Sequence, residues 1–305
     1  MDRFILIDGN AILHRAYHAL PPLTDKEGNI VNAVYGFFSM LLTVIGEYSP
    51  TYLAVCFDRP KPTFRQEMYV GYQQHRPKMS DDLVPQIERV HQVLKQMSIP
   101  LFEIDGYEAD DLIGTLSVQI PKKDDNLEVL ILSGDRDLLQ LVNEHVKMLA
   151  PIVGVKNIIF YDSVKVKEKF GILPSQIVDY KALVGDSSDG YPGVTGIGPK
   201  TASDLLSKYE TFENLYKHLG EINPKIAEKL ALDAEQASLA KKLATIVKDA
   251  PISVDILQCD ISCFDRDGTQ KAFENLGFKS LLARIPQSLG VKKETSVESE
   301  QLGLL

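Results

Sequence analysis

Acidic side chains recur in this chain directly after short apolar runs. Asp8 ends FILID, Asp58 ends LAVCFD, and Asp135 follows VLILSG. The remaining members of the set follow the same or later runs: Glu108, Asp110, Asp111, Asp137, Asp186 and Asp189. In an open α/β sheet the carboxyl ends of parallel strands face one crevice, so we expect these carboxylates to meet there. Their mutual repulsion requires cations among them, and hard oxygen ligands suit Mg²⁺ or Mn²⁺.

The spacing within the set supports a metal site acting on phosphates. Glu108 and Asp111 are three residues apart and would share one helix face, while Asp135 and Asp137 would point the same way on an extended segment. Sites with two metal ions, ~3.5–4 Å apart, clamp both oxygens of an in-line phosphoryl displacement and need several carboxylates. Each acid alone could instead be a turn or helix-capping residue. The set as a whole predicts a metal-dependent enzyme that hydrolyses phosphodiesters.

A basic segment rich in aromatic residues follows Asp58 directly. Residues 59–78 contain a single acid, Glu67, among these cations and rings: Arg59, Lys61, Phe64, Arg65, Tyr69, Tyr72, His75, Arg76 and Lys78. Cations with stackable rings suit single-stranded nucleic acid. The alternative is a solvated surface excursion. Its position after Asp58 predicts that it overhangs the crevice.

The stretch GVTGIGPKTASDLL contains a second candidate for phosphate binding. Small residues open onto a helix whose first backbone N–H groups are free to meet an anion. The spacing of a Walker loop is absent, whereas G-I-G-P-K-T is the pattern of a helix-hairpin-helix, which binds the DNA backbone without reading its sequence. An ordinary glycine-rich turn between helices is the alternative.

Strands that alternate with helices over the first 161 residues predict a mostly parallel α/β sheet with flanking helices. From about 162 to 250 the pattern becomes a series of short helices. PISVDI near 251 is interpreted as one strand returning to the sheet, residues 264–285 as one or two closing helices, and residues from 288 as a polar linker or disordered tail.

Bulk composition is that of a soluble globular chain. The net charge is −9, from 33 basic and 42 acidic residues. Removing the nine suspected metal ligands leaves 33 acids against 33 bases, so net charge does not exclude a nucleic-acid partner. Three cysteines, the lack of a signal-like N-terminus and the lack of an apolar run of roughly 18 residues predict a cytoplasmic protein with no membrane partner.

Together these ordered motifs resemble the 5′-nuclease domain of bacterial DNA polymerase I, in the flap endonuclease superfamily. The resemblance spans roughly residues 2–285 and rests on LIDGNAILHRAYHAL, AVYGF, FRQEMYVGYQQHRP, GYEADD, SGDRDLLQL and ALVGDSSDGYPGVTGIGPKTA. It implies a PIN-like core over residues 1–161 with a helical arch at 59–82. A helical region over 162–287 would carry the helix-hairpin-helix near 192–207, and a linker or tail would occupy 288–305.

The resemblance also assigns roles to residues. All nine acids match the metal-binding acids of the family, and Asp8, Asp58, Asp110, Asp111, Asp135 and Arg76 match its catalytic set. DNA contacts are implied at Arg65, Tyr72, Gln73, Arg76, Lys78, Gly196, Ile197, Gly198, Lys200 and Thr201. The implied cofactors are two Mg²⁺ ions, with Mn²⁺ possible, and K⁺ on backbone carbonyls of the hairpin. The implied substrate is DNA with a 5′ flap, a nick or an RNA primer, and a polymerase domain could follow this chain.

Two residues depart from the family pattern. Gln73 stands where the family usually has lysine after the tyrosine, which removes a cation expected near the scissile phosphate. Gly190 stands where asparagine is frequent. Two rival functions therefore remain open at this point: a PIN-type ribonuclease acting on single strands, and a weakly catalytic module that binds DNA junctions.

Overall fold

The computed structural model describes residues 2–76, 78–153, 157–287 and 289–290. Their central element is a six-stranded sheet in the order β3-β2-β1-β4-β5-β6, parallel except for β6, which runs antiparallel to β5. The strands are β1 (Asp2–Asp8), β2 (Tyr52–Cys56), β3 (Leu101–Phe102), β4 (Leu127–Leu132), β5 (Val146–Val153) and β6 (Asn157–Tyr161). The mostly parallel sheet predicted from the alternation of strands and helices is thus present.

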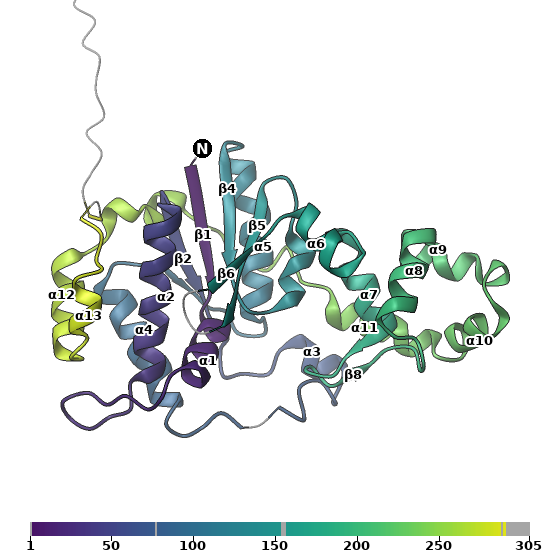
Figure 1. Cartoon of the computed structure of the whole chain (residues 1–305), viewed down its shortest axis with the longest axis horizontal. Helices are drawn as coiled ribbons and strands as arrows, with labels where there is room; N and C mark the ends of the chain where they lie inside the picture. The colour runs from purple at the N-terminus through teal and green to yellow at the C-terminus, as the bar shows by residue number, and fades with distance from the viewer. Residues whose placement is uncertain (1, 77, 154–156, 288, 291–305) are drawn as a thin grey trace, which may run out of the picture.

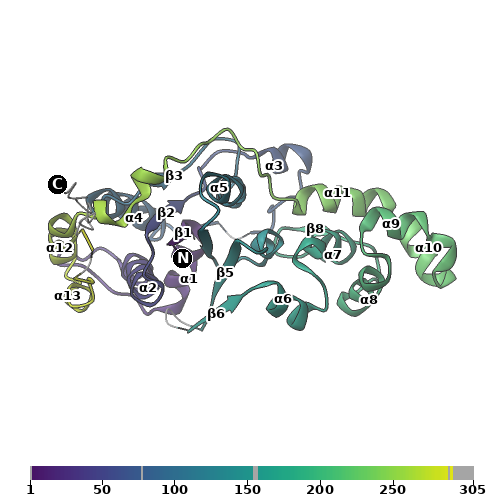
Figure 2. The ribbon, with the colours of Figure 1, turned by 90° about the horizontal axis from the view of Figure 1, so that it is seen from above.

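The sheet is buried on both faces because its strands are continuously apolar. Phe4 and Leu6 of β1 point into one core, and Ile5 and Ile7 point into the other. The helix α5 covers the first face, and α1, α2 and α4 cover the second, as Figure 2 shows for α5 and α2. These helices are α1 (Gly9–Ala19), α2 (Asn32–Tyr48), α4 (Val84–Gln96) and α5 (Ala109–Lys123). The closing helices α12 (Arg266–Asn275) and α13 (Lys279–Leu282) join the second core, as predicted.

The order of the strands fixes where a ligand can bind. The chain moves outward from β1 to β2 and β3, then returns to place β4 on the other side of β1. In open α/β sheets the crevice lies at such a switch point, outside the carboxyl ends of the strands. Asp8 is the last residue of β1, and Asp135 follows β4 by a short turn. The fold therefore brings these two acids to the switch point.

The segment from 59 to 82 crosses below the carboxyl ends of the strands (Figure 1). Of its described residues, only α3 (Phe64–Met68) is helical, and α4 begins just after it. Turns and extended backbone make up the rest. This segment thus lies where the overhang was predicted.

The region from α6 to α11 is helical, as predicted for about 162 to 250, and extends away from the sheet (Figure 1). Its helices are α6 (Ser163–Phe170), α7 (Ile177–Val184), α8 (Pro199–Tyr209), α9 (Phe212–Lys217), α10 (Pro224–Leu232) and α11 (Ala234–Ala244). Short 3₁₀ turns accompany them: η1 (Arg136–Leu141), η2 (Pro174–Gln176), η3 (Leu219–Glu221), η4 (Ile256–Cys259) and η5 (Ile261–Cys263). Between α7 and α8 lies a small hairpin, β7 (Gly185–Asp186) and β8 (Tyr191–Pro192).

One prediction about this half is wrong. PISVDI forms no strand, and the chain reaches the sheet edge only through an isolated bridge between Tyr52 and Asp260. The segment is held by single side-chain bonds to its carbonyls, such as Gln119 Nε2 to Ile252 O (2.8 Å), rather than by a ladder. The predicted tail from 288 lies outside the described residues except for Leu289 and Gly290. Among the described helices, none has both the length and the apolar character to cross a bilayer.

Candidate active site

A crevice of about 580 Å³ opens at the switch point of the sheet. Seven of the nine predicted acids line it: Asp8, Asp58, Glu108, Asp110, Asp135, Asp137 and Asp189. The predicted cations Arg65, Arg76 and Lys78 and the polar Gln73 line it as well. The structure thus brings most of the predicted site together from five separate stretches of chain. Asp186 reaches the same site through Asp137 and Asp189, and Asp111 lies elsewhere.

Backbone and side-chain bonds fix the first carboxylates in place. Asp8 caps α1 by accepting from Ala11 N (2.9 Å), and its other oxygen accepts from Ser133 Oγ (2.6 Å). This second bond ties the end of β1 to the end of β4 across the switch point. Asp58 accepts from Ala109 N (2.7 Å), so it fixes the start of α5 relative to β2. Both acids line the crevice.

The helix α5 supplies two further carboxylates at its N-terminus. Glu108 is its capping residue and accepts from Thr63 Oγ1 (2.9 Å) and Tyr72 Oη (3.1 Å), both on the 59–82 segment. Asp110 lies in the first turn, where the helix dipole favours a negative charge. These contacts join the overhanging segment to the metal-binding end of the sheet.

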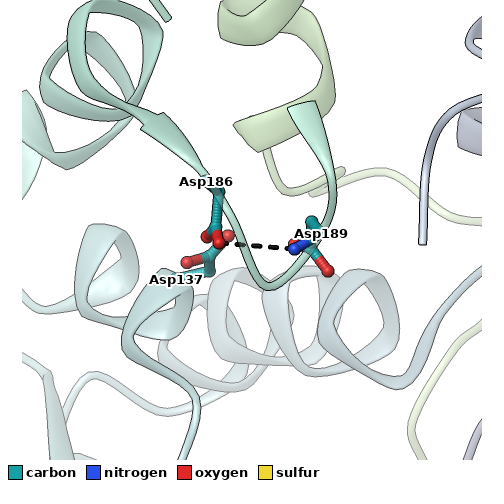
Figure 3. A group of neighbouring side chains, drawn as sticks. All are labelled: Asp137, Asp186 and Asp189. Atoms are coloured by element: carbon teal, nitrogen blue, oxygen red, sulfur yellow. Dashed lines mark hydrogen bonds between the residues drawn. The ribbon is translucent and has the colours of Figure 1, made fainter. Parts of the chain in front are cut away.

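A second group of carboxylates lies beside the first. Oxygen atoms of Asp137, Asp186 and Asp189 lie within 4.8 Å of one another (Figure 3). Asp137 comes from η1, after β4, whereas Asp186 and Asp189 come from the β7–β8 hairpin. Asp189 N donates to Asp186 Oδ1 (3.3 Å), which closes the hairpin turn. The group therefore unites the two halves of the chain.

Lys181 is a site residue that the sequence analysis missed. Its ammonium contacts both Asp137 and Asp186, and its side chain is 14% exposed. The sequence carried a weak signal, because Lys181 is the one cation in the largely apolar helix α7, five residues before Asp186. This ammonium partly neutralises the second group.

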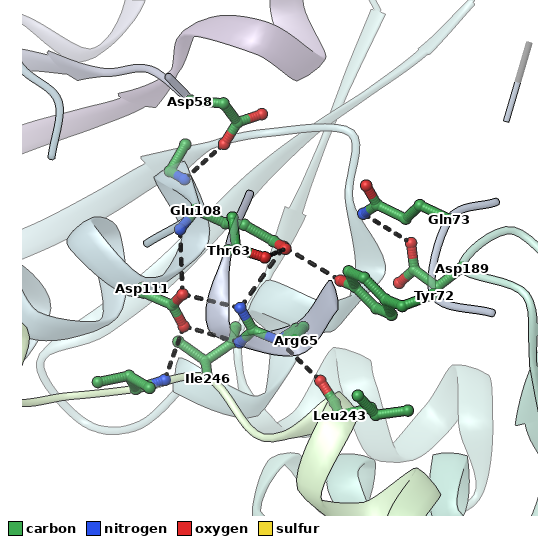
Figure 4. Close-up of polar contacts among 12 residues, drawn as sticks. Asp58, Thr63, Arg65, Tyr72, Gln73, Glu108, Asp111, Asp189, Leu243 and Ile246 are labelled. Atoms are coloured by element: carbon green, nitrogen blue, oxygen red, sulfur yellow. Dashed lines mark hydrogen bonds and ion pairs between the residues drawn. The ribbon is translucent and has the colours of Figure 1, made fainter. Parts of the chain in front are cut away.

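Asp111 and Arg65 do not have the positions that were predicted for them. Asp111 is fully buried, and its two oxygens accept from Arg65 Nη1 (2.8 Å) and Nη2 (2.7 Å) (Figure 4). Val247 N (2.9 Å) and Glu108 N (3.2 Å) also donate to Asp111, and Arg65 Nε donates to Leu243 O (2.9 Å). A carboxylate saturated in this way has no lone pair left for a metal. We therefore correct both predictions: Asp111 is not placed to hold an ion, nor is buried Arg65 placed to contact DNA.

Other predicted DNA-binding residues have mixed positions. Tyr72 is 5% exposed and packs beside Tyr191 and α11, so its ring has no free face for a base. Arg76 and Lys78 are exposed at the crevice. In the turn before α8, Gly196 has φ +73, Ile197 is buried, and Gly198 caps the helix. Lys200 is exposed in the first turn of α8, directly followed by half-buried Thr201.

Burial gives the crevice carboxylates an unusual tendency to hold protons. It raises the pKa of Asp8 to about 7, in spite of the bond from Ser133, and raises the pKa of Glu108 to about 7 as well. Burial, then the charges of Asp135, Asp8 and Asp58, raise the pKa of Asp110. Asp186 differs, because Lys181 outweighs burial and lowers its pKa. Carboxylates with such raised pKa values gain from a bound cation.

The donor set fits divalent metal ions. The two groups of carboxylates offer hard oxygen ligands, which suit Mg²⁺ or Mn²⁺, while His14 and His18 line the same crevice but belong to neither group. The first group, Asp8, Asp58, Glu108, Asp110 and Asp135, lines the crevice, and the second group, Asp137, Asp186 and Asp189, adjoins it. Together the two groups offer enough oxygen ligands for more than one ion.

The raised pKa values predict how stability depends on pH without metal. A group with a raised folded-state pKa contributes stability below its unfolded pKa, near 4 here, and loses it as pH rises through the folded pKa, about 7 for Asp8 and Glu108. The melting temperature in EDTA should therefore fall between pH 5 and pH 8. Thermal melts across this range test the prediction, and saturating Mg²⁺ should reverse most of the fall. A flat profile in EDTA would contradict it.

Comparison with known protein families agrees with this site. The family model described as 5′-3′ exonuclease, N-terminal resolvase-like domain, matches residues 3–171, and the one described as 5′-3′ exonuclease, C-terminal SAM fold, matches residues 172–267. The chain belongs to the 5′-3′ exonuclease family. The prediction of a nuclease is thereby confirmed, and the second group of carboxylates joins acids from both family domains.

Some relatives of this chain have about its length, and others are longer proteins that contain a similar region. The 5′-3′ exonuclease of Aquifex aeolicus is 38% identical over 285 residues, covering 93% of this chain and 96% of that protein. DNA polymerase I of Bacillus subtilis is 39% identical over 300 residues, covering 98% of this chain and 33% of that protein. The chain therefore spans about a third of the length of the polymerase relatives it matches.

Solved structures show that the fold is shared more widely. The T5 D15 protein co-crystallised with metal ions has a TM-score of 0.69 at 19% identity, covering 90% of this chain and 99% of that chain. The catalytic core of Rad2 in complex with DNA substrate has a TM-score of 0.55 at 15% identity, covering 90% and 86%. At these identities the similarity concerns the fold alone, and it confirms the predicted fold class.

Proposed function

We propose that this exonuclease is a structure-specific nuclease that cuts DNA at a 5′ flap or nick, using two Mg²⁺ ions. The observation that carries the proposal is the crevice at the switch point, where two adjoining groups of carboxylates lie beneath a basic segment. When bound, the ions would lower the pKa of water and stabilise charge on the leaving oxygen. Removal of RNA primers and repair are the cellular roles proposed for it, next to a polymerase domain.

The residues of the chain would perform three tasks around the scissile phosphate. Asp8, Asp58 and Asp110 would hold one ion at the switch point, and the second group would hold the other. Arg76 lies at the crevice with its guanidinium 2.7 Å from Asp189, so a small movement would bring it to a phosphate oxygen. Tyr72 and Thr63 would keep Glu108 oriented through their hydroxyl groups.

Duplex DNA would dock on the turn before α8. Gly198 caps the helix, Pro199 at its first position needs no N–H partner, and exposed Lys200 follows. Two side chains hold the turn in place. Lys229 Nζ, on α10, donates to Gly196 O (3.2 Å), and Asp233, between α10 and α11, accepts from Thr195 N (2.6 Å). A K⁺ ion proposed for these carbonyls would therefore compete with the Lys229 ammonium.

Lys200→Ala should weaken duplex binding uniformly across sequences. One lost phosphate contact lowers the slope of log K against log salt by roughly 1. Fluorescence anisotropy at several salt concentrations measures this slope, with Lys165→Ala on the exposed surface of α6 as the control. An unchanged slope would place the duplex elsewhere on the protein.

Cleavage of a 5′-flap DNA substrate tests the proposed function directly. The flap substrate and the matching single strands of DNA and RNA are each incubated with Mg²⁺ or with EDTA. Metal-dependent cutting within about a nucleotide of the junction supports the proposal. Cutting of single-stranded RNA alone would assign the chain to the rival ribonuclease class, and tight flap binding without cutting would assign it to the binding modules.

A further inference from the structure

The turn from Gly71 to Arg76 is docked on the second group of carboxylates. Arg76 Nη2 lies 2.7 Å from Asp189 Oδ1, and Gln73 Nε2 donates to the same oxygen (3.2 Å). The backbone N–H of Gln73 also donates to the Asp189 carbonyl (2.7 Å). Three separate donors on one turn therefore converge on one aspartate (Figure 4 shows Gln73 against Asp189).

The docking depends on two unusual backbone positions. Gln73 has φ +56, a left-handed conformation that costs a non-glycine residue on the order of 1 kcal/mol, and its contacts with Asp189 compensate for this. Gly190 has φ +76, and a Cβ built there would lie 2.9 Å from the Gly71 carbonyl oxygen. The turn can thus approach this closely only because residue 190 has no side chain. Gln73 and Gly190 are also the two departures from the family pattern.

The same turn reaches the first group as well. Tyr72, between Gly71 and Gln73, donates its hydroxyl to Glu108 (3.1 Å), while its ring packs beside Tyr191 at the base of the hairpin. The turn consequently spans both groups of carboxylates and occupies oxygens that metal ions would need.

We propose that the Gly71–Arg76 turn is a latch: it holds Asp189 in the metal-free protein and is released when a divalent ion binds at Asp137, Asp186 and Asp189. Gln73 and Gly190 are then positioning residues that act through Asp189. Release would free Arg76 for the substrate phosphate. Because the latch and the ion compete for one carboxylate, weakening the latch must tighten metal binding by the same factor. The proposal rests on the metal site of the proposed function.

The test uses two glycines with similar backbones. Asparagine tolerates positive φ, so Gly190→Asn keeps the hairpin but pushes against the Gly71 carbonyl. The matched control is Gly28→Asn, at φ +86 with no atom within 4 Å of the added Cβ. Mn²⁺ affinity is measured by electron paramagnetic resonance of the free ion. We expect the Gly190→Asn protein to bind the ion about five- to tenfold more tightly than the control, as for loss of one or two hydrogen bonds.

A second readout follows the turn itself. The chain contains no tryptophan, so His75→Trp, at an exposed position in the turn, reports on it without background. Mg²⁺ should shift the emission of this introduced tryptophan in the otherwise unchanged chain, and Gly190→Asn should give the shifted spectrum before any metal is added. Gln73→Gly, which suits the positive φ and removes only the amide contact, should tighten Mn²⁺ binding in the same direction by a smaller factor.

Failure of the latch and failure of the metal site give different results. The latch would be overturned by equal Mn²⁺ affinities in the Gly190→Asn and Gly28→Asn proteins. It would also be overturned if saturating Mg²⁺ did not change the tryptophan emission of the His75→Trp protein. In either case flap cleavage would still support the proposed function. Absence of any Mn²⁺ binding, together with absence of cleavage, would overturn both.

Discussion

Asp110→Asn is expected to slow DNA cleavage by roughly a thousandfold while raising the melting temperature of the metal-free protein. A metal contribution of about 4 kcal/mol to the transition state corresponds to this factor. Burial and the charges of Asp135, Asp8 and Asp58 raise the pKa of Asp110, so its ionised form destabilises the folded chain near pH 8. Single-turnover cleavage of flap DNA and thermal melts in EDTA measure the two effects.

The control for this variant is Asp125→Asn, whose parent side chain is 90% exposed. It should change neither the rate nor the melting temperature. A loss of activity accompanied by a lower melting temperature would mean that Asp110 maintains the fold rather than holding an ion. Binding of uncut flap DNA in EDTA should be unchanged in both proteins.

Asp111→Ala should instead destabilise the protein by about 3–5 kcal/mol, because it leaves the buried Arg65 guanidinium without its partner. For a chain of this length the melting temperature would fall by roughly 5–8 °C. Chemical denaturation gives the free energy of unfolding. The double variant Arg65→Met with Asp111→Leu removes both charges and should recover a large part of the loss.

The Asp111→Ala variant distinguishes the buried ion pair with Arg65 from the metal-binding role that the GYEADD motif suggested for Asp111. If Asp111 held a metal ion, its removal would relieve repulsion, raise metal-free stability and weaken Mn²⁺ binding. The ion pair predicts the opposite for stability, with the Mn²⁺ affinity of the surviving folded protein little changed.

The ends of strands could be predicted from sequence because a continuous apolar run stops there and turn residues follow. β4, LEVLIL, contains the apolar run that was noted before Asp135, since a continuous apolar run next to a turn is typical of a strand buried on both faces. Asp8 and Asp135 could likewise be placed at the crevice, because parallel strands share one carboxyl edge. The segment PISVDI has the composition of a strand, but its carbonyls accept from side chains such as Gln119 instead of from a neighbouring strand, and no local pattern in the sequence reports that.

Within the site, the sequence could identify carboxylates but not their partners. Asp110 and Asp111 are adjacent, with the same chemistry, yet one faces the crevice and the other faces Arg65. That choice depends on where α11 ends, since Leu243 and Val247 complete the burial of the pair. Lys181 was missed for a related reason, because its role appears only when α7 is packed against η1.

The β7–β8 hairpin has a consequence for where the substrate is cut. Six residues separate Asp189, in the second group, from Gly196, in the turn proposed to hold the duplex, and this stretch cannot exceed roughly 25 Å. Tyr191 and Val194 are buried along it, so its length is fixed by packing. If the duplex docks at this turn as proposed, the fixed length would set the distance from the duplex to the scissile bond, and the site of incision would be independent of flap length and base sequence.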